Sequence, residues 1–145
     1  MQIEIHPYNE TYREPIISVW EKSVRATHDF LTPDDIAFYK KLVSEIDFRA
    51  FSVYCLTSSQ NVLGFLGVLD NKIEMLFVDP AYIGQGLGRT LMLFALDNLH
   101  ADKVDVNEEN TKAIAFYTKF GFIPYERLEK DSEGKDHPIL KMKRP

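Results

Sequence analysis

Three side chains in this sequence have the chemistry for proton transfer: Tyr117, Glu74 and His28. A tyrosine phenol, with a usual pKa near ~10, can donate a proton to a departing group of similar basicity. Glu74 interrupts the apolar run KIEMLFV, so its carboxylate is either solvated at a strand edge or held where it can act as a base. The imidazole of His28 titrates near ~6.5 and could do the same work, but a single loop histidine is more often a surface residue.

Tyr117 also fits a structural role. It belongs to a stripe with helical spacing, formed by Ala113, Phe116, Tyr117 and Phe120. A tyrosine in such a stripe can be a core residue whose hydroxyl finds a local partner. From the residues alone, a general acid and a core residue are equally good interpretations of Tyr117.

A glycine-spaced turn offers a second kind of chemistry. Gly84, Gly86 and Gly88 alternate just before an apolar helix, where glycine permits left-handed backbone angles and close approach of a ligand. The N–H groups of a first helical turn have no internal partner and attract phosphate. The pattern is neither a P-loop nor a dinucleotide fingerprint, because Ile83 and Arg89 stand where those motifs need a glycine or a lysine. The residues alone allow two interpretations of this turn: it binds an anion, or it is a tight connection without a ligand.

Two asparagines precede the helix that carries Tyr117. Asn107 and Asn110 flank the end of the strand-like run KVDVN, and Asn110 is in the position of a helix N-cap. Capping does not exclude a contact of the same side chain with a ligand.

Composition limits the functions open to the chain. Its net charge of -5 provides no diffuse basic field for nucleic acid and favours a cationic substrate. The single Cys55 excludes an internal disulfide, leaves a metal site without its usual thiolates and is best explained by core packing. No apolar run approaches the ~20 residues of a membrane helix, and MQIEIHPYNE lacks the order of a signal peptide, so we expect a cytoplasmic protein.

Hydrophobic periodicity and turn residues predict the elements that would position these groups. We expect strands at 2–6, 50–57, 62–69, 72–78, 103–107, 122–129 and 138–143, and helices at 11–26, 32–46, from the glycine turn to about 99, and 111–120. The order is βααβββαβαββ, an α+β arrangement with one mixed sheet, in a single domain over residues 1–145.

The stretch MLFVDPAYIGQGLGRTLMLFAL resembles the acetyl-CoA pyrophosphate loop of the GCN5-related N-acetyltransferase (GNAT) family. Its Pro80, Tyr82, Gly86 and Gly88 match that pattern, with Ile83 at the place of an Arg or Gln. The stretch VNEENTKAIAFYTKFGF resembles the second signature of the family, and SVRATHDFL resembles a stretch in an uncharacterised bacterial branch of it. With the element order, the resemblance covers nearly the whole chain.

The resemblance implies a GNAT-like three-layer α/β/α domain and an acetyl-CoA-dependent N-acetyltransferase. Such an enzyme moves the acetyl group of acetyl-CoA directly to a primary amine of a small molecule, peptide or protein, without an acyl-enzyme and without a metal. A CoA-binding sensory module of the same fold and a ligand-free interaction domain are the alternatives. Expected partners are an amine acceptor, no nucleic acid and no membrane, with the chain a monomer or homodimer.

The resemblance also implies the site residues. Tyr117 would lie beside the CoA sulfur as the acid, with Glu74 or His28 as the base. The residues expected to bind the cofactor are Leu76, Phe77, Val78, Gly84, Gln85, Gly86, Leu87, Gly88, Arg89, Thr90, Asn107, Asn110 and Tyr117. The acceptor would be lined by segments 28–35 and 131–138, whose carboxylates favour a cation or are solvated loops.

Overall fold

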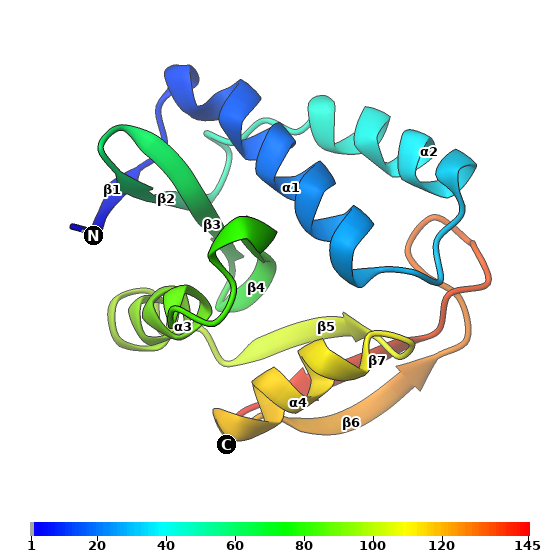
Figure 1. Cartoon of the computed structure of the whole chain (residues 1–145). Helices are drawn as coiled ribbons and strands as arrows, with labels where there is room; N and C mark the ends of the chain where they lie inside the picture. The colour runs from blue at the N-terminus through cyan, green and yellow to red at the C-terminus, as the bar shows by residue number, and fades with distance from the viewer. Residues whose placement is uncertain (1) are drawn as a thin grey trace.

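A mixed sheet of seven strands forms the centre of the structure, a computed structural model that describes residues 2–145 (Figure 1). The strands are β1 (Glu4–Pro7), β2 (Ser52–Ser58), β3 (Asn61–Leu69), β4 (Lys72–Val78), β5 (Lys103–Asn107), β6 (Ile123–Leu128) and β7 (Ile139–Lys143). The helices are α1 (Arg13–Thr27), α2 (Pro33–Ser44), α3 (Leu87–Asn98) and α4 (Thr111–Lys119), with 3-10 turns at Glu10–Tyr12 and Pro80–Tyr82. Neighbouring strands follow the order β1-β2-β3-β4-β5-β7-β6. The predicted order βααβββαβαββ is confirmed.

Local sequence explains the turns and helix starts. Both central residues of each tight hairpin, 59–60 and 70–71, have positive φ angles, as two-residue hairpin turns require. Thr32 and Asp35 form a reciprocal capping box at the start of α2. The first α-helix begins at Arg13 and not at residue 11 as predicted, because Asn9 accepts a hydrogen bond from the Thr11 N–H and caps a separate 3-10 turn.

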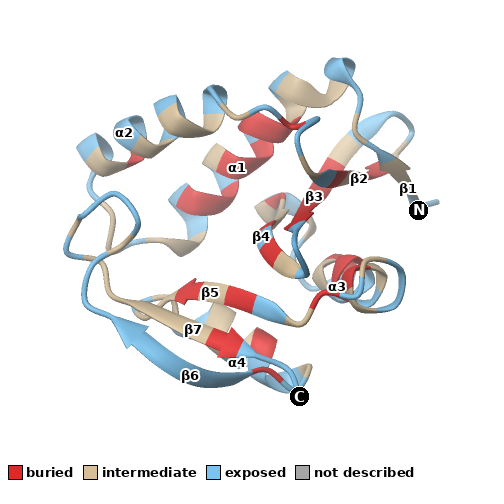
Figure 2. Ribbon diagram, turned by 180° about the vertical axis from the view of Figure 1, so that it is seen from behind, coloured by how far each residue is buried: buried red, intermediate tan, exposed pale blue. Residues whose placement is uncertain are grey.

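Helices cover both faces of the sheet (Figure 2). On one face, α1 and α2 bury Trp20 and Ile36 against Phe65 of β3. On the other face, α3 and α4 bury Leu91 and Tyr117 in a second core. The result is the three-layer α/β/α arrangement expected from the sequence. None of the helices in residues 2–145 combines the length and the apolar character needed to cross a membrane.

The only parallel pair of the described sheet, β4 and β5, separates after two residues. Lys72 pairs with Lys103 and Ile73 with Val104, and the two strands then diverge (Figure 1). Each strand keeps its ladder on its other side, β4 with β3 and β5 with β7. The sheet is therefore split like a V at its centre, and the gap leaves one edge of β4 without a strand partner.

Glu74 is the residue at which the strands part. In the β3–β4 register Gly67 faces Met75 and Val68 faces Ile73, so Glu74 is an extra residue in β4 and forms a β-bulge. A bulge interrupts the alternation of side chains and bends the strand. Here the bulge directs the carboxylate of Glu74 outward, although the residues on either side of it, Ile73 and Met75, are buried.

Cys55 is a core residue, as its apolar run predicted. It is fully buried in β2 among the side chains that α1 and α2 cover. Burial raises the pKa of its thiol to about 12, so the sulfur stays protonated and has little nucleophilic character at neutral pH.

Candidate active site

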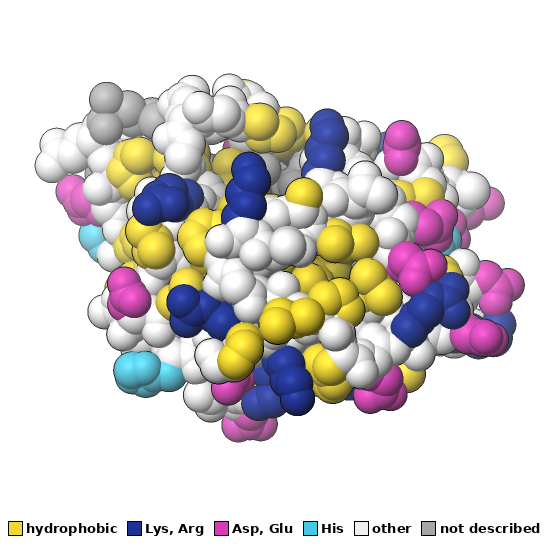
Figure 3. All heavy atoms as spheres, turned by 90° about the horizontal axis from the view of Figure 1, so that it is seen from below, with side chains coloured by type: hydrophobic (Ala, Val, Ile, Leu, Met, Phe, Trp, Pro, Cys, Tyr) yellow, Lys and Arg dark blue, Asp and Glu magenta, His cyan; other side chains and the backbone are white. Residues whose placement is uncertain are grey.

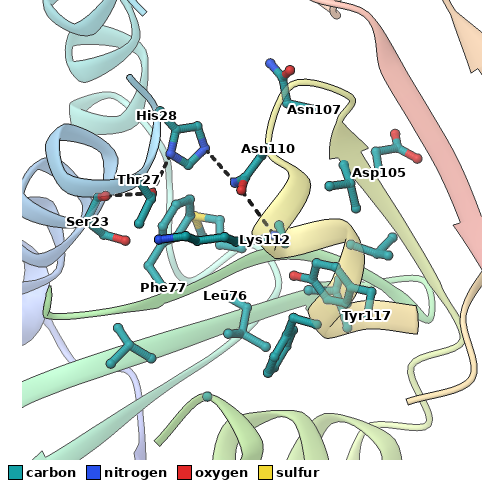
Figure 4. A pocket seen from close by; sticks show the side chains of 18 of the residues that line it. Ser23, Thr27, His28, Leu76, Phe77, Asp105, Asn107, Asn110, Lys112 and Tyr117 are labelled. Carbon is teal, nitrogen blue, oxygen red and sulfur yellow. Dashed lines mark hydrogen bonds between the residues drawn. The ribbon is translucent and has the colours of Figure 1, made fainter. Parts of the chain in front are cut away.

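The divergence of β4 and β5 opens a cleft of about 340 Å³, whose walls also include the end of α1 and one face of α4 (Figure 4). Several side chains predicted for a site lie in its wall, although they are far apart in the sequence: His28, Glu74, Asn107, Asn110 and Tyr117. The cleft therefore brings an acid candidate, both base candidates and two amides together.

The edge of β4 that faces the cleft carries unpaired backbone groups. The N–H of Asp79 donates to the C=O of Leu63 on β3 at 2.8 Å. In an antiparallel ladder every second residue of a strand bonds to the same neighbour, so Phe77 is the next residue whose backbone bonds to β3. Alternation then turns the N–H and C=O groups of Leu76 and Val78 toward the side that β5 has left. An extended ligand with amide groups can pair there as an added strand.

The glycine turn presents free N–H groups where the cleft opens. Gly84 and Gly86 have φ angles of 87° and 76°, and Gly86 is the N-cap of α3. The first intrahelical hydrogen bond runs from the N–H of Thr90 to the C=O of Gly86 at 3.0 Å, so the N–H groups of residues 87–89 have no helical partner. These donors and the positive end of the helix form a seat for an anion.

Gly88 is needed for close packing of two helices and not for an unusual backbone conformation. It is a helical residue of α3, so the left-handed angle that we associated with this turn applies to Gly84 and Gly86 only. A Cβ on Gly88 would lie 3.3 Å from the ring of Phe116. The glycine thus allows α3 to approach α4 closely at the edge of the cleft.

A basic hollow continues the cleft beyond Phe116. This ring lines both the cleft and a second cavity of about 640 Å³ between α3 and α4. The cations of the hollow are Arg89, Lys119 and Arg144. On the face of the molecule seen from below, hydrophobic side chains lie among Lys and Arg side chains (Figure 3). A ligand with a phosphate at one end and an apolar arm at the other would meet complementary surface along this path.

Tyr117 lies at both the core and the cleft. It is the one buried residue of α4, and its ring makes edge contacts with Phe116 and Phe122. No hydrogen bond contributes to the environment of its hydroxyl, and no polar side-chain atom in residues 2–145 is fully buried without a partner, so this oxygen opens to the cleft that the residue lines. Burial raises the pKa of the phenol, so the group remains protonated well above neutral pH. The ring serves packing, and the proton is available to a ligand.

Glu74 is exposed at the bulge, on the wall of the same cleft. Its Oε1 lies 3.9 Å from the Nζ of Lys72, which in turn lies 2.7 Å from Oδ2 of Asp105 on β5. Of the two environments that the sequence allowed for this carboxylate, the structure shows the solvated one. It is reachable by an incoming amine or by a bridging water molecule.

His28 ends α1 and contacts the start of α4. Its Nδ1 lies 2.8 Å from Oγ1 of Thr27, and its Nε2 lies 3.3 Å from Nδ2 of Asn110. Asn110 is the N-cap of α4, as predicted, with Oδ1 accepting from the N–H of Ala113 at 3.1 Å. Burial lowers the pKa of the imidazole, which favours the neutral ring. Both ring nitrogens of His28 are occupied.

An apolar groove adjoins the cleft on its α1–α2 side. His28, Phe77 and Asn107 line both spaces, so the groove opens beside the candidate catalytic groups. Its walls are apolar residues of α1, α2, β4 and β7, and the β6–β7 segment adds the carboxylates of Asp131 and Glu133. Oδ2 of Asp131 accepts a hydrogen bond from the hydroxyl of Tyr39, which fixes that segment against α2.

Sequence reasoning missed several residues of the cleft. Lys112 in the first turn of α4, Asp105 of β5 and Thr27 of α1 all line it. Asp105 alternates in KVDVN with residues that point into the core, and this pattern could have indicated that it faces the gap. The contact between Tyr39 and Asp131 spans 92 residues and has no signal in the sequence.

Comparison with known proteins gives a consistent result. Residues 22–143 match the family model described as "Acetyltransferase (GNAT) domain". The chain is 36% identical over 142 residues to "Peptidyl-lysine N-acetyltransferase YjaB" of Salmonella typhimurium, with 98% of each chain covered. It is 32% identical to the protein of the same name from Escherichia coli, with 98% of this chain and 97% of the relative covered.

Solved structures show the same fold. The solution structure of apo YjaB from Escherichia coli superposes with a TM-score of 0.89 at 31% identity, covering 99% of this chain and 97% of the other. The crystal structure of the PaiA N-acetyltransferase of Thermoplasma acidophilum in complex with coenzyme A gives 0.78 at 19% identity, with both chains covered completely. The predicted GNAT-like fold is confirmed.

Proposed function

The chain belongs to the GNAT family of acetyltransferases and moves the acetyl group of acetyl-CoA to an amine, and from this premise we propose that its acceptor is a lysine side chain of a peptide or protein. The observation that carries the proposal is the groove beside the cleft. A lysine side chain joins four apolar methylenes to a cationic amine, and the groove joins apolar walls to carboxylates. The curated relatives that cover the chain are named peptidyl-lysine N-acetyltransferases, which supports the same class of acceptor.

We propose that acetyl-CoA lies along the cleft with its diphosphate on the N–H groups at the start of α3. The pantetheine amides would pair with the cleft edge of β4, and the adenosine phosphate would meet the basic hollow that contains Arg89. The residues assigned to the cofactor are Leu76, Phe77, Val78, Gly84, Gln85, Gly86, Leu87, Gly88, Arg89, Thr90, Asn107, Asn110 and Tyr117. Ile83 is 63% exposed on the cleft wall and would add apolar contact where an Arg or Gln stands in the family pattern.

The proposed reaction needs three groups. Glu74 takes a proton from the lysine ammonium, directly or through water, and the free amine then attacks the thioester carbonyl carbon. An N–H of β4 that faces the cleft can stabilise the oxyanion that forms. As the carbon–sulfur bond breaks, the electron pair goes to sulfur and Tyr117 donates its proton to the thiolate. The products are the acetylated lysine and free CoA, with no acyl-enzyme between them.

Replacing Glu74 with glutamine should lower kcat with lysine peptides by about tenfold and leave the affinity for acetyl-CoA unchanged. This is less than the 10²-fold or more that a general base can supply, because Glu74 is exposed and water can take over part of its work. Steady-state kinetics checks the effect. The matched control is Glu126→Gln, which changes an exposed glutamate of β6 outside the cleft and should retain full turnover. Equal rates for both variants and the parent would remove Glu74 from the mechanism.

The acceptor class is tested by a panel of amines at fixed acetyl-CoA. Lysine-containing peptides should show the highest kcat/KM, ahead of free lysine, spermidine and a peptide whose only amine is its N-terminus. A preference for spermidine or for the N-terminal amine would overturn the lysine proposal but leave the acetyltransferase in place.

We also propose that residues 1–145 act as one acetyltransferase domain, as a monomer or homodimer in the cytoplasm of a bacterium. The two hydrophobic cores lie on opposite faces of one sheet, which supports a single domain. Both YjaB relatives come from bacteria, which supports the bacterial setting.

A further inference from the structure

A chain of hydrogen bonds connects the end of α1 to the start of α4 beside the cleft (Figure 4). The Thr27 hydroxyl donates to the C=O of Ser23 at 2.8 Å, and Thr27 Oγ1 lies 2.8 Å from Nδ1 of His28. Nε2 of His28 lies 3.3 Å from Nδ2 of Asn110, whose Oδ1 accepts from the N–H of Ala113 at 3.1 Å. The imidazole thus joins α1 to α4 through a contact between two residues that are 82 positions apart in the sequence.

The groups at the two ends of this hydrogen-bond chain determine the protonation state and the tautomer of the His28 ring. The Asn110 oxygen is used by the helix cap, so its amide turns an N–H toward His28 and Nε2 must accept. The Thr27 hydroxyl hydrogen is used by Ser23, so Thr27 can only accept from His28 and Nδ1 must carry the hydrogen. Both requirements select the neutral Nδ1–H tautomer. An imidazolium would place two donors, Nε2–H and Nδ2–H, against each other.

We propose that neutral His28 is a positioning residue, which holds the Asn110 cap and thereby fixes α4 and Tyr117 against α1. The need for such a tether follows from the shortness of α4, which has nine residues and buries Tyr117 alone. This role differs from that of a base, since the lone pair of Nε2 is already used. The inference goes beyond lysine acetylation. Only its kinetic test depends on the proposed role of Tyr117, because the tautomer is measured without substrate.

The surroundings of His28 favour the neutral ring. Burial lowers the pKa of His28, and the adjacent Asp29 opposes this only in part. Lys112 of α4 lines the cleft beside the ring, while Asp131 and Glu133 of the β6–β7 segment line the groove on its other side. Since the folded pKa lies below the unfolded value of ~6.5, the tether is intact above that pH and is lost as the pH falls through the folded pKa.

The direct test is the ¹⁵N NMR spectrum of the histidine side chains in the unliganded protein. We expect His28 to be the neutral Nδ1–H tautomer at pH 7.5, about one unit above the usual histidine pKa of ~6.5. Exposed His6, whose Nε2 lies 2.8 Å from Oε2 of Glu4, is the internal control. An Nε2–H tautomer or an imidazolium at His28 would overturn the proposal.

Two variants separate the tether from the cap. Asn110→Ser keeps a good cap but removes the donor to Nε2, so kcat should fall about fivefold, the equivalent of one neutral hydrogen bond. Asn110→Asp also keeps the cap but offers Nε2 a carboxylate, which accepts from Nε2–H and should make His28 an imidazolium in the ¹⁵N spectrum at neutral pH. Unchanged kcat in the serine variant, or a neutral His28 in the ¹⁵N spectrum of the aspartate variant, would contradict the positioning role.

Discussion

Removing only the hydroxyl of Tyr117, in Tyr117→Phe, should reduce turnover about 100-fold while the free energy of unfolding and the affinity for acetyl-CoA stay near those of the parent. The ring packs edge-on against Phe116 and Phe122, and phenylalanine preserves those contacts. Burial, and no hydrogen bond, raises the pKa of the hydroxyl, so its loss breaks no hydrogen bond within residues 2–145. What the variant lacks is the proton that we propose Tyr117 donates to the departing thiolate.

The matched control for this variant is Tyr125→Phe, which removes a hydroxyl from a tyrosine of β6 that is 44% exposed and lies outside the cleft. Its turnover should equal that of the parent. A Tyr117→Phe protein that keeps turnover within a few-fold of the parent would show that the thiolate leaves without help from this phenol. A large loss of stability would instead show that the hydroxyl satisfies a buried partner.

Gly86→Val should abolish measurable binding of acetyl-CoA, with affinity lowered by at least about 100-fold, as expected when two hydrogen bonds to a charged diphosphate are lost. The cause is backbone conformation, because Gly86 has a φ of 76° and a β-branched residue avoids such angles. No atom lies within 4 Å of the position of its Cβ, so the variant folds without a steric clash. The N–H groups at the start of α3 would then be turned away from the phosphates. Calorimetry with acetyl-CoA measures the effect.

Gly134 supplies a closely matched control. It also has a φ of 76° and open space around its Cβ position, but it lies in the β6–β7 segment. Gly134→Val should therefore carry a similar backbone penalty and keep its affinity for acetyl-CoA. If both valine variants bind acetyl-CoA as well as the parent does, the diphosphate is held elsewhere.

The elements and their order could be predicted because each depends on residues close together in sequence. Apolar spacing identified the helices and strands, and hairpin residues such as Asp70 and Asn71 identified the turns. The caps Thr32 and Asn110 also act on amides only three residues away. Such local patterns need no knowledge of the tertiary structure.

The shape of the cleft could not be predicted in the same way. The divergence of β4 from β5 and the bulge at Glu74 follow from the register between strands, which the sequence of one strand does not determine. His28 and Asn110 were each candidates, but their contact links positions 82 residues apart. The sequence therefore indicated which residue types could act, and the fold determined which of them meet.

The most direct test of lysine acetylation in this cleft is to follow both products of one reaction. Purified protein, acetyl-CoA and a peptide with one lysine and a blocked N-terminus are mixed, free thiol is titrated, and the peptide is analysed by fragment mass spectrometry. We expect one acetyl group on the lysine Nζ for each CoA thiol released, and no acetylated protein intermediate when the peptide is left out. Thiol release without acetylation of the peptide lysine, or an acetyl group found first on the protein and then on the peptide, would contradict direct transfer to lysine.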